Sequence, residues 1–232
     1  MKIKSEYTGT ILSVGYVHLN PFTATESQLK ELSSIRERVI PVISDIYKMK
    51  VQIISDYEEG SLKSWLWIAG TLYIGIGNYG EFRSGVEYLA KDAKMVAEKL
   101  NELVIHDFKP NESQIFRVER RTAVPGILKV VIHKVDSLAA NINDMSPHQV
   151  KEQLLDIDHT LQRAVDLSSV NEDQTYMIKE TINLLDEHFP VQPTSQQQNK
   201  IPVYAWRKEL ELLVQETQSS ESRRVISRIY LH

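Results

Sequence analysis

The spacing of apolar residues changes partway along this 232-residue chain, and that change restricts the fold more than any other feature. Before residue 109, β-formers such as Tyr16 and Val17, together with the apolar run at 51–54, indicate strands. After residue 109, apolar residues recur at steps of three and four, as is typical of amphipathic helices. We therefore predict an α+β chain, with a sheet domain at 1–109 followed by helices.

Within the first domain, the predicted order of elements is β–α–β–β–α. Residues 2–19 are predicted to form one or two strands, and 25–46 an amphipathic helix that Pro41 should kink or end near Ile40. Residues 51–54 and 62–68 fit a hairpin, and the three- and four-residue spacing returns at 82–103. This order favours an antiparallel sheet covered by helices.

In the second half, three helix starts carry the same capping pattern. Asn111, Ser146 and Asn171 are each followed three residues later by Gln. Helices are accordingly predicted at 112–122, 127–142, 147–168 and 172–188, forming a helical bundle domain at 110–188. Residues 189–203 are rich in proline and polar side chains and are predicted to be a linker, with a C-terminal helical segment at 204–232.

Composition excludes several classes of protein. The chain has no cysteine, which rules out a disulfide-stapled module, a thiol enzyme and a Cys-ligated metal site. A net charge of −4, from 27 basic and 31 acidic residues, argues against a dedicated nucleic-acid binder. The N-terminus lacks the pattern of a signal peptide, so a cytoplasmic location is expected.

The segment at 64–80 is uncharged and rich in aromatic and glycine residues. The favoured interpretation is a buried strand followed by a Gly-rich turn. The alternative is a membrane segment, although 17 residues reach only the lower limit for a spanning helix. Gly75, Gly77 and Gly80 also match the spacing of a dinucleotide-binding loop, but tight backbone packing is favoured because the preceding strand belongs to a hairpin.

No compact catalytic or metal-binding set is visible, so we predict a chain that is not an enzyme and needs no cofactor or metal. The acidic and lysine residues around the hairpin lack the spacing of metal-dependent nucleases and fit a polar turn. Two basic clusters remain, one at the C-terminal end (Arg223, Arg224, Arg228). The other is Arg117, Arg120 and Arg121, which would share one face of the predicted helix at 112–122 and could dock an acidic partner.

Residues 7–105 resemble, in element order, the N-terminal interaction domain of the death-receptor adaptor TRADD and related domains of bacterial conflict systems. The resemblance rests on the β–α–β–β–α order and on Gly80, Phe82 and Arg83 at the start of the last helix. It implies a non-catalytic adaptor module of an immune or cell-death pathway.

We therefore expect a non-enzymatic assembly or adaptor subunit that forms homo- or hetero-oligomers with protein partners. One alternative is a membrane-acting effector that exposes 64–80 when triggered, and another is a nucleic-acid-associated subunit that uses the arginine cluster. Aromatic and arginine side chains are favoured as contacts because such anchors dominate interface energies. The candidate contact residues are Trp65, Trp67, Tyr73, Tyr79, Phe82, Arg117, Arg120, Arg121 and Trp206.

Overall fold

The computed structural model describes residues 7–22, 25–58, 62–190 and 197–219. The chain divides into two compact units after Gly126, the first containing a sheet and the second composed of helices. The prediction of an α+β fold with a helical C-terminal part is confirmed. The predicted elements at 2–6 and 223–231 lie outside the described residues, as does part of the predicted linker.

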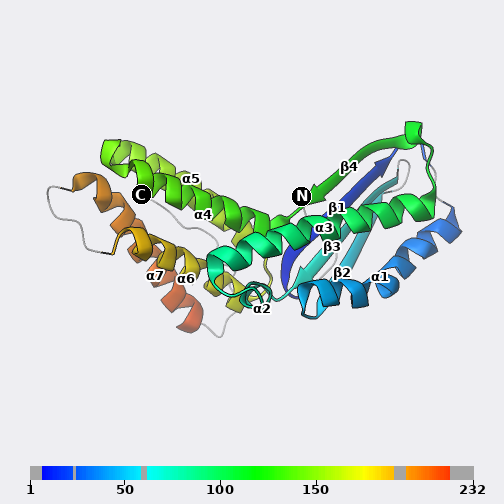
Figure 1. Ribbon diagram of the computed structural model, residues 1–232, viewed down its shortest axis with the longest axis horizontal. Helices are drawn as coiled ribbons and strands as arrows, with labels where there is room; N and C mark the ends of the chain where they lie inside the picture. Colours follow the sequence, from blue (N-terminus) through cyan, green and yellow to red (C-terminus); the bar gives the residue numbers. More distant parts are fainter. Residues whose placement is uncertain (1–6, 23–24, 59–61, 191–196, 220–232) are drawn as a thin grey trace. The chain divides into compact units, whose positions relative to one another are not determined.

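The first unit is built on a four-stranded antiparallel sheet (Figure 1). Its strands are β1 (Thr10–Leu19), β2 (Val51–Glu58), β3 (Leu62–Gly70) and β4 (Ile115–Arg121), in the spatial order β2-β3-β1-β4. The hairpin of β2 and β3 confirms the pairing predicted for 51–54 and 62–68. Strand β1 lies between β3 and β4, and all of its residues from Thr10 to Val17 are buried.

Two helices, α1 (Glu26–Tyr47) and α3 (Phe82–Phe108), cover one face of this sheet. Gly15 of β1 lies against α3, where an added Cβ would stand 2.7 Å from Asn101 Oδ1 and 3.1 Å from Leu100 Cβ. On the same face, Tyr47 of α1 donates a hydrogen bond of 3.1 Å to Ser13 Oγ. Since side chains alternate along a strand, Val14, Tyr16 and His18 point to the opposite face.

Of the two outcomes predicted for Pro41, a kink or an end near Ile40, the end is wrong, because α1 continues to Tyr47 with Pro41 inside it. The uncharged segment 64–80 is divided between β3 and a short helix, α2 (Leu72–Gly77), where a turn was predicted. Gly75 of α2 lies against Met49 and Leu89, which fits the tight packing favoured for these glycines, whereas nothing lies within 4 Å of a Cβ placed on Gly77 or Gly80. Strand β3 is antiparallel to both neighbours, so the parallel unit of a dinucleotide site is not formed.

The helix predicted at 112–122 is wrong. Asn111 and Gln114 do form a capping box, with the Asn111 amide donating to Gln114 Oε1 at 2.8 Å. That box begins only a short 3₁₀ turn, η1 (Glu112–Gln114), after which the chain extends as β4. Pairing with β1 prevails over the helical signal, and it places Arg117 and Arg121 on a different strand face from Arg120.

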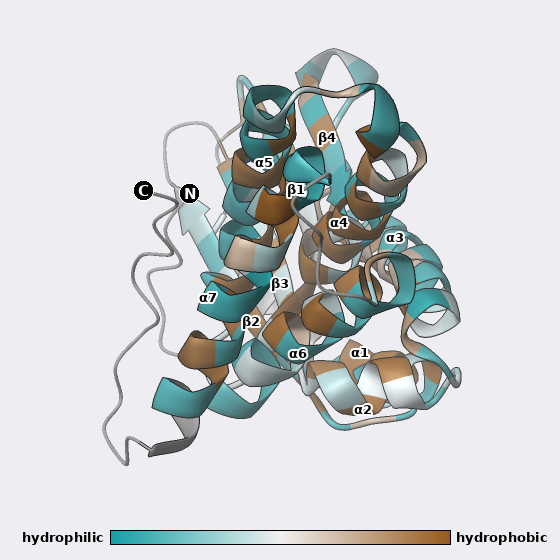
Figure 2. Ribbon diagram, turned by 90° about the vertical axis from the view of Figure 1, so that its left-hand side faces the viewer, coloured by the Kyte–Doolittle hydropathy of each residue, from teal (hydrophilic) through white to brown (hydrophobic). Residues whose placement is uncertain are grey.

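The second unit contains α4 (Ala123–Asn141) from Ile127 onward, α5 (Pro147–Val165), α6 (Asn171–His188) and α7 (Ile201–Ser219), with the short turns η2 (Ile142–Asp144) and η3 (Gln198–Lys200). Four of the five helices predicted after residue 109 are thus present. Figure 2 shows that individual helices such as α5 carry apolar and polar residues on different sides. The apolar sides form a buried core, as expected of amphipathic helices in a bundle.

Polar contacts tie these helices together at specific points. Lys134 of α4 forms an ion pair with Asp156 of α5 at 2.7 Å, and Arg207 of α7 pairs with Asp186 of α6 at 2.8 Å. Helix α7 packs against α5 and α6. In the described part of the chain, no helix has both the length and the apolar composition needed to cross a membrane.

Candidate interaction surfaces

The two tryptophans of β3 lie on the sheet face opposite α1 and α3. Register places Trp65 beside Tyr16 and Trp67 beside Val14, so these side chains share that face. The rings of Tyr16 and Trp65 are 5.0 Å apart and tilted by 36°. Trp65 is half-buried, whereas Trp67 is only 5% exposed. Trp67 is therefore mainly a core residue, whereas part of the Trp65 side chain is accessible to solvent.

A cluster of charges continues this face onto β4. Glu119 forms ion pairs with Arg117 and with Arg121, and the Arg121 Nε–Glu119 Oε2 contact measures 2.6 Å. Arg120 projects to the other face and pairs at 2.5 Å with Glu98 of α3. The three arginines therefore do not form the single docking patch that the helical interpretation predicted. Each has a carboxylate partner within its own chain.

Two exposed apolar residues of the sheet lie on β4. Phe116 is 68% exposed and Val118 is 42% exposed. The register of β4 against β1 shifts at Phe116, and the phenyl ring lies edge-on to His18 with centroids 4.8 Å apart. Such a bulge redirects a side chain at a sheet margin. Neither residue was among the contacts predicted from sequence, although the alternation of apolar and charged residues at 116–119 is a strand signal.

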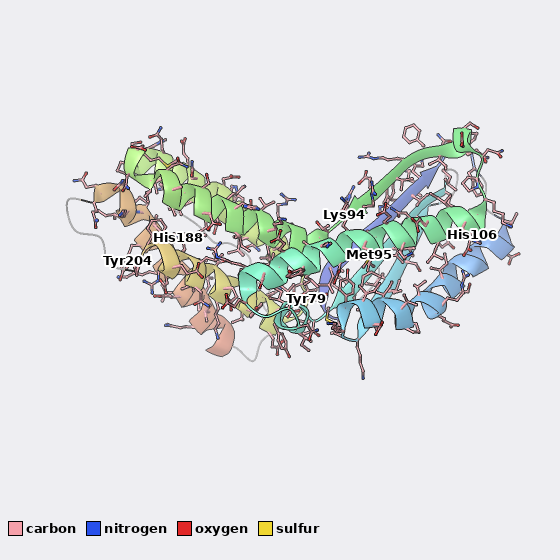
Figure 3. The ribbon with its side chains drawn as sticks, viewed as in Figure 1. Tyr79, Lys94, Met95, His106, His188 and Tyr204 are labelled. Carbon is pink, nitrogen blue, oxygen red and sulfur yellow. The ribbon has the colours of Figure 1, made fainter. Side chains whose placement is uncertain are left out.

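The turn between α2 and α3 gathers the remaining predicted aromatic contacts of the first unit. Tyr79, labelled in Figure 3, donates a hydrogen bond to Asp92, and its ring stacks on Tyr88 at 5.6 Å. Burial, reinforced by the neighbouring Asp92 carboxylate, raises the pKa of Tyr79. Through these contacts Tyr79 holds the turn against α3. Phe82 is partly buried, and Tyr73 is 47% exposed and available for contact.

Trp206 lies inside the helical unit and is fully buried. Its Nε1 donates a hydrogen bond of 2.9 Å to Asp158 of α5. Burial raises the pKa of Asp158 to about 6, although the hydrogen bond from Trp206 acts in the opposite direction. Because no part of the indole is exposed, its role here is to fix α7 against α5.

A cavity of about 210 Å³ lies between the end of α6 and the start of α7, with His188 and Tyr204 on its wall (Figure 3). Basic and aromatic side chains on the wall would favour an anionic ligand, but two of the basic side chains already pair with carboxylates. His188 contacts Asp136 at 2.9 Å, and Arg207 contacts Asp186 and Glu211. The cavity is also smaller than the usual range of ligand sites, which begins at about 300 Å³.

The described residues contain no group of three or more His, Asp or Glu side chains arranged to hold a metal ion. Searches against protein-family models, curated proteins and solved structures find no match for this chain. Of the surfaces described above, the margin of the sheet at β4 combines exposed apolar side chains, charges and an accessible strand edge.

Proposed function

We propose that this chain is a non-enzymatic assembly subunit that binds protein through the outer edge of β4, which in the described residues pairs with no strand other than β1. The observation that carries the proposal is the exposure of Phe116 and Val118 on a terminal strand of the sheet. A strand in this position offers backbone N–H and C=O groups to a further strand. Addition of a partner strand is an established mode of protein recognition.

Other features support an interaction role. Tyr73 and Tyr88 add exposed aromatic surface at α2 and α3, at 47% and 53% exposure. Aromatic side chains are enriched among the residues that dominate interface energies. That the partner belongs to an immune or cell-death pathway is a prediction, and it rests on the resemblance of residues 7–105 alone.

The membrane alternative would require a costly rearrangement. Its segment, 64–80, includes most of β3, which is hydrogen-bonded to β1 on one side and to β2 on the other. Release of that segment would separate both strand pairs and expose Leu66 and Ile68, which are buried. No observation among the described residues favours that rearrangement over the binding of a protein at β4.

The test is photo-crosslinking in cells of the source organism. A photoreactive phenylalanine replaces Phe116 in the full chain, and a control chain carries it at Leu212 of α7, which is 58% exposed. We expect a discrete crosslinked protein from position 116 that is absent from position 212. Val118→Lys should abolish this product, because a charge at the centre of the edge opposes strand addition.

Absence of any discrete product at position 116, with the chain folded and abundant, would contradict the proposal. A product that survives Val118→Lys unchanged would also contradict it, because the contact would then not depend on the edge. The mass of the product identifies the partner as another protein or as a second copy of the chain.

A further inference from the structure

We propose that the strand added at β4 is β4 of a second copy, paired antiparallel about Val118. This inference rests on the proposed function and specifies its partner. In the described residues, β4 hydrogen-bonds to β1 on one side only, and Figure 1 shows it along the outer border of the sheet. The second copy would join two sheets into a continuous one.

The sequence of β4 is self-complementary in this register. When Val118 lies opposite Val118 of the second copy, Arg117 of each chain lies opposite Glu119 of the other. The two-fold symmetry of the pairing forms this oppositely charged pair twice. The apolar side chains meet at the centre, where Val118 is 42% exposed in the single chain.

Neighbouring registers lack this complementarity. Centring the pair on Arg117 or on Arg120 places two identical arginines opposite one another, and centring it on Glu119 places two glutamates together. Like charges directly opposite on antiparallel strands are destabilising. The register about Val118 is therefore selected over these three alternatives.

The charges available on β4 also fit this arrangement. Glu119 lies between Arg117 and Arg121 within one chain and pairs with both, so Arg117 shares this carboxylate with a second cation. The second copy supplies another carboxylate to Arg117, while Arg120 remains engaged by Glu98. Dimer formation thus gives Arg117 a second acidic neighbour and does not place like charges opposite one another.

The decisive experiment uses charge reversal on the full chain, followed by size-exclusion chromatography with light scattering. We expect the unmodified chain to be a dimer of about 53 kDa, twice the 26.7 kDa of one chain. Arg117→Glu and Glu119→Arg should each be monomeric, because each variant places like charges opposite one another. An equimolar mixture of the two variants should form a heterodimer, since every pair in the mixture is again oppositely charged.

Recovery of the heterodimer cannot arise from contacts within one chain, and it shows that both variants are folded. Lys99→Glu and Glu102→Arg, charge reversals at exposed positions of α3, serve as matched controls and should remain dimeric. The self-pairing inference is overturned if the unmodified chain is monomeric, if either single variant stays dimeric, or if the mixture stays monomeric. A crosslink from position 116 to a different protein would then leave the proposed function standing, whereas no crosslink at all would remove both.

Discussion

At the scale of single residues, Asp158 is a carboxylate that is only 3% exposed in the helical core and whose pKa is raised. Burial raises its pKa from 3.8 to about 6, so the folded chain holds this proton more tightly than the unfolded chain. The stability it contributes is therefore present below pH 3.8 and is lost as the pH rises to about 6. A pKa difference of this size corresponds to about 3 kcal/mol.

Asp158→Asn should remove this pH dependence. The amide oxygen can still accept from Trp206, while the buried charge disappears, so the variant should be more stable than the unmodified chain by about 3 kcal/mol at pH 7. At pH 4 the two should be nearly equal. Denaturant unfolding at both pH values measures the difference, with Asp144→Asn, at an exposed position, as the control. An identical difference at pH 4 and pH 7 would exclude the buried charge as its source.

Trp206 was a predicted contact residue, but it is fully buried, so we expect its replacement to affect stability rather than binding. Trp206→Ala should lower the free energy of unfolding by about 3–5 kcal/mol, because it leaves a large cavity between α7 and α5. Leu212→Ala, on the exposed side of the same helix, should change it by less than about 1 kcal/mol. Chromatography under native conditions should show the same oligomeric state for both. Loss of the dimer in folded Trp206→Ala would restore Trp206 as an interface residue.

At the scale of elements, the contact between α2 and α3 depends on a glycine. A Cβ on Gly85 would lie 2.6 Å from both Cγ2 and the carbonyl oxygen of Ile76, so the helices would have to separate. We expect Gly85→Ala to destabilise the chain by about 1–3 kcal/mol. Gly77→Ala is the matched control in α2: nothing lies within 4 Å of its Cβ position, and helix propensity favours alanine. Thermal unfolding of both variants compares them, and equal effects would refute the contact.

The elements that could be predicted from the sequence are those that local patterns specify. Amphipathic spacing located α1, α3 and the helices of the second unit, and the hairpin of β2 and β3 followed from two apolar runs around a polar turn. Strand β4 was missed because its partner β1 is about 100 residues away in the chain. A true capping box at Asn111, placed directly before it, pointed to a helix.

The candidate surface was predictable only in part for the same reason. Trp65 was singled out as an aromatic side chain and Arg117 as part of a predicted helical face, but their common sheet face follows from the register of three strands. Phe116 and Val118 were missed because the capping box at Asn111 indicated a helix over these positions, although their two-residue spacing is a strand signal. The exposure of a side chain depends on the folded structure and cannot be predicted from composition.

At the scale of the whole molecule, the proposed dimer should respond to salt. Arg117 is 61% exposed, so the ion pairs across β4 would be open to solvent and screened by added ions. We expect the dissociation constant, measured by analytical ultracentrifugation, to rise as sodium chloride is increased from low to physiological ionic strength and beyond. Arg117→Lys, which keeps the charge but loses the planar guanidinium, should dimerise more weakly and retain the same salt trend. A dissociation constant that does not respond to salt would remove the ion pairs from the explanation.

The position of β4 as the last strand of the sheet also sets an upper limit on the number of subunits. Two copies that join through the same edge consume that edge completely, and the strands left at the two ends of the enlarged sheet are both β2. Growth would then need a second kind of contact, between one β2 edge and another. Self-pairing through β4 by itself would therefore stop at two copies and give a closed dimer rather than a fibre.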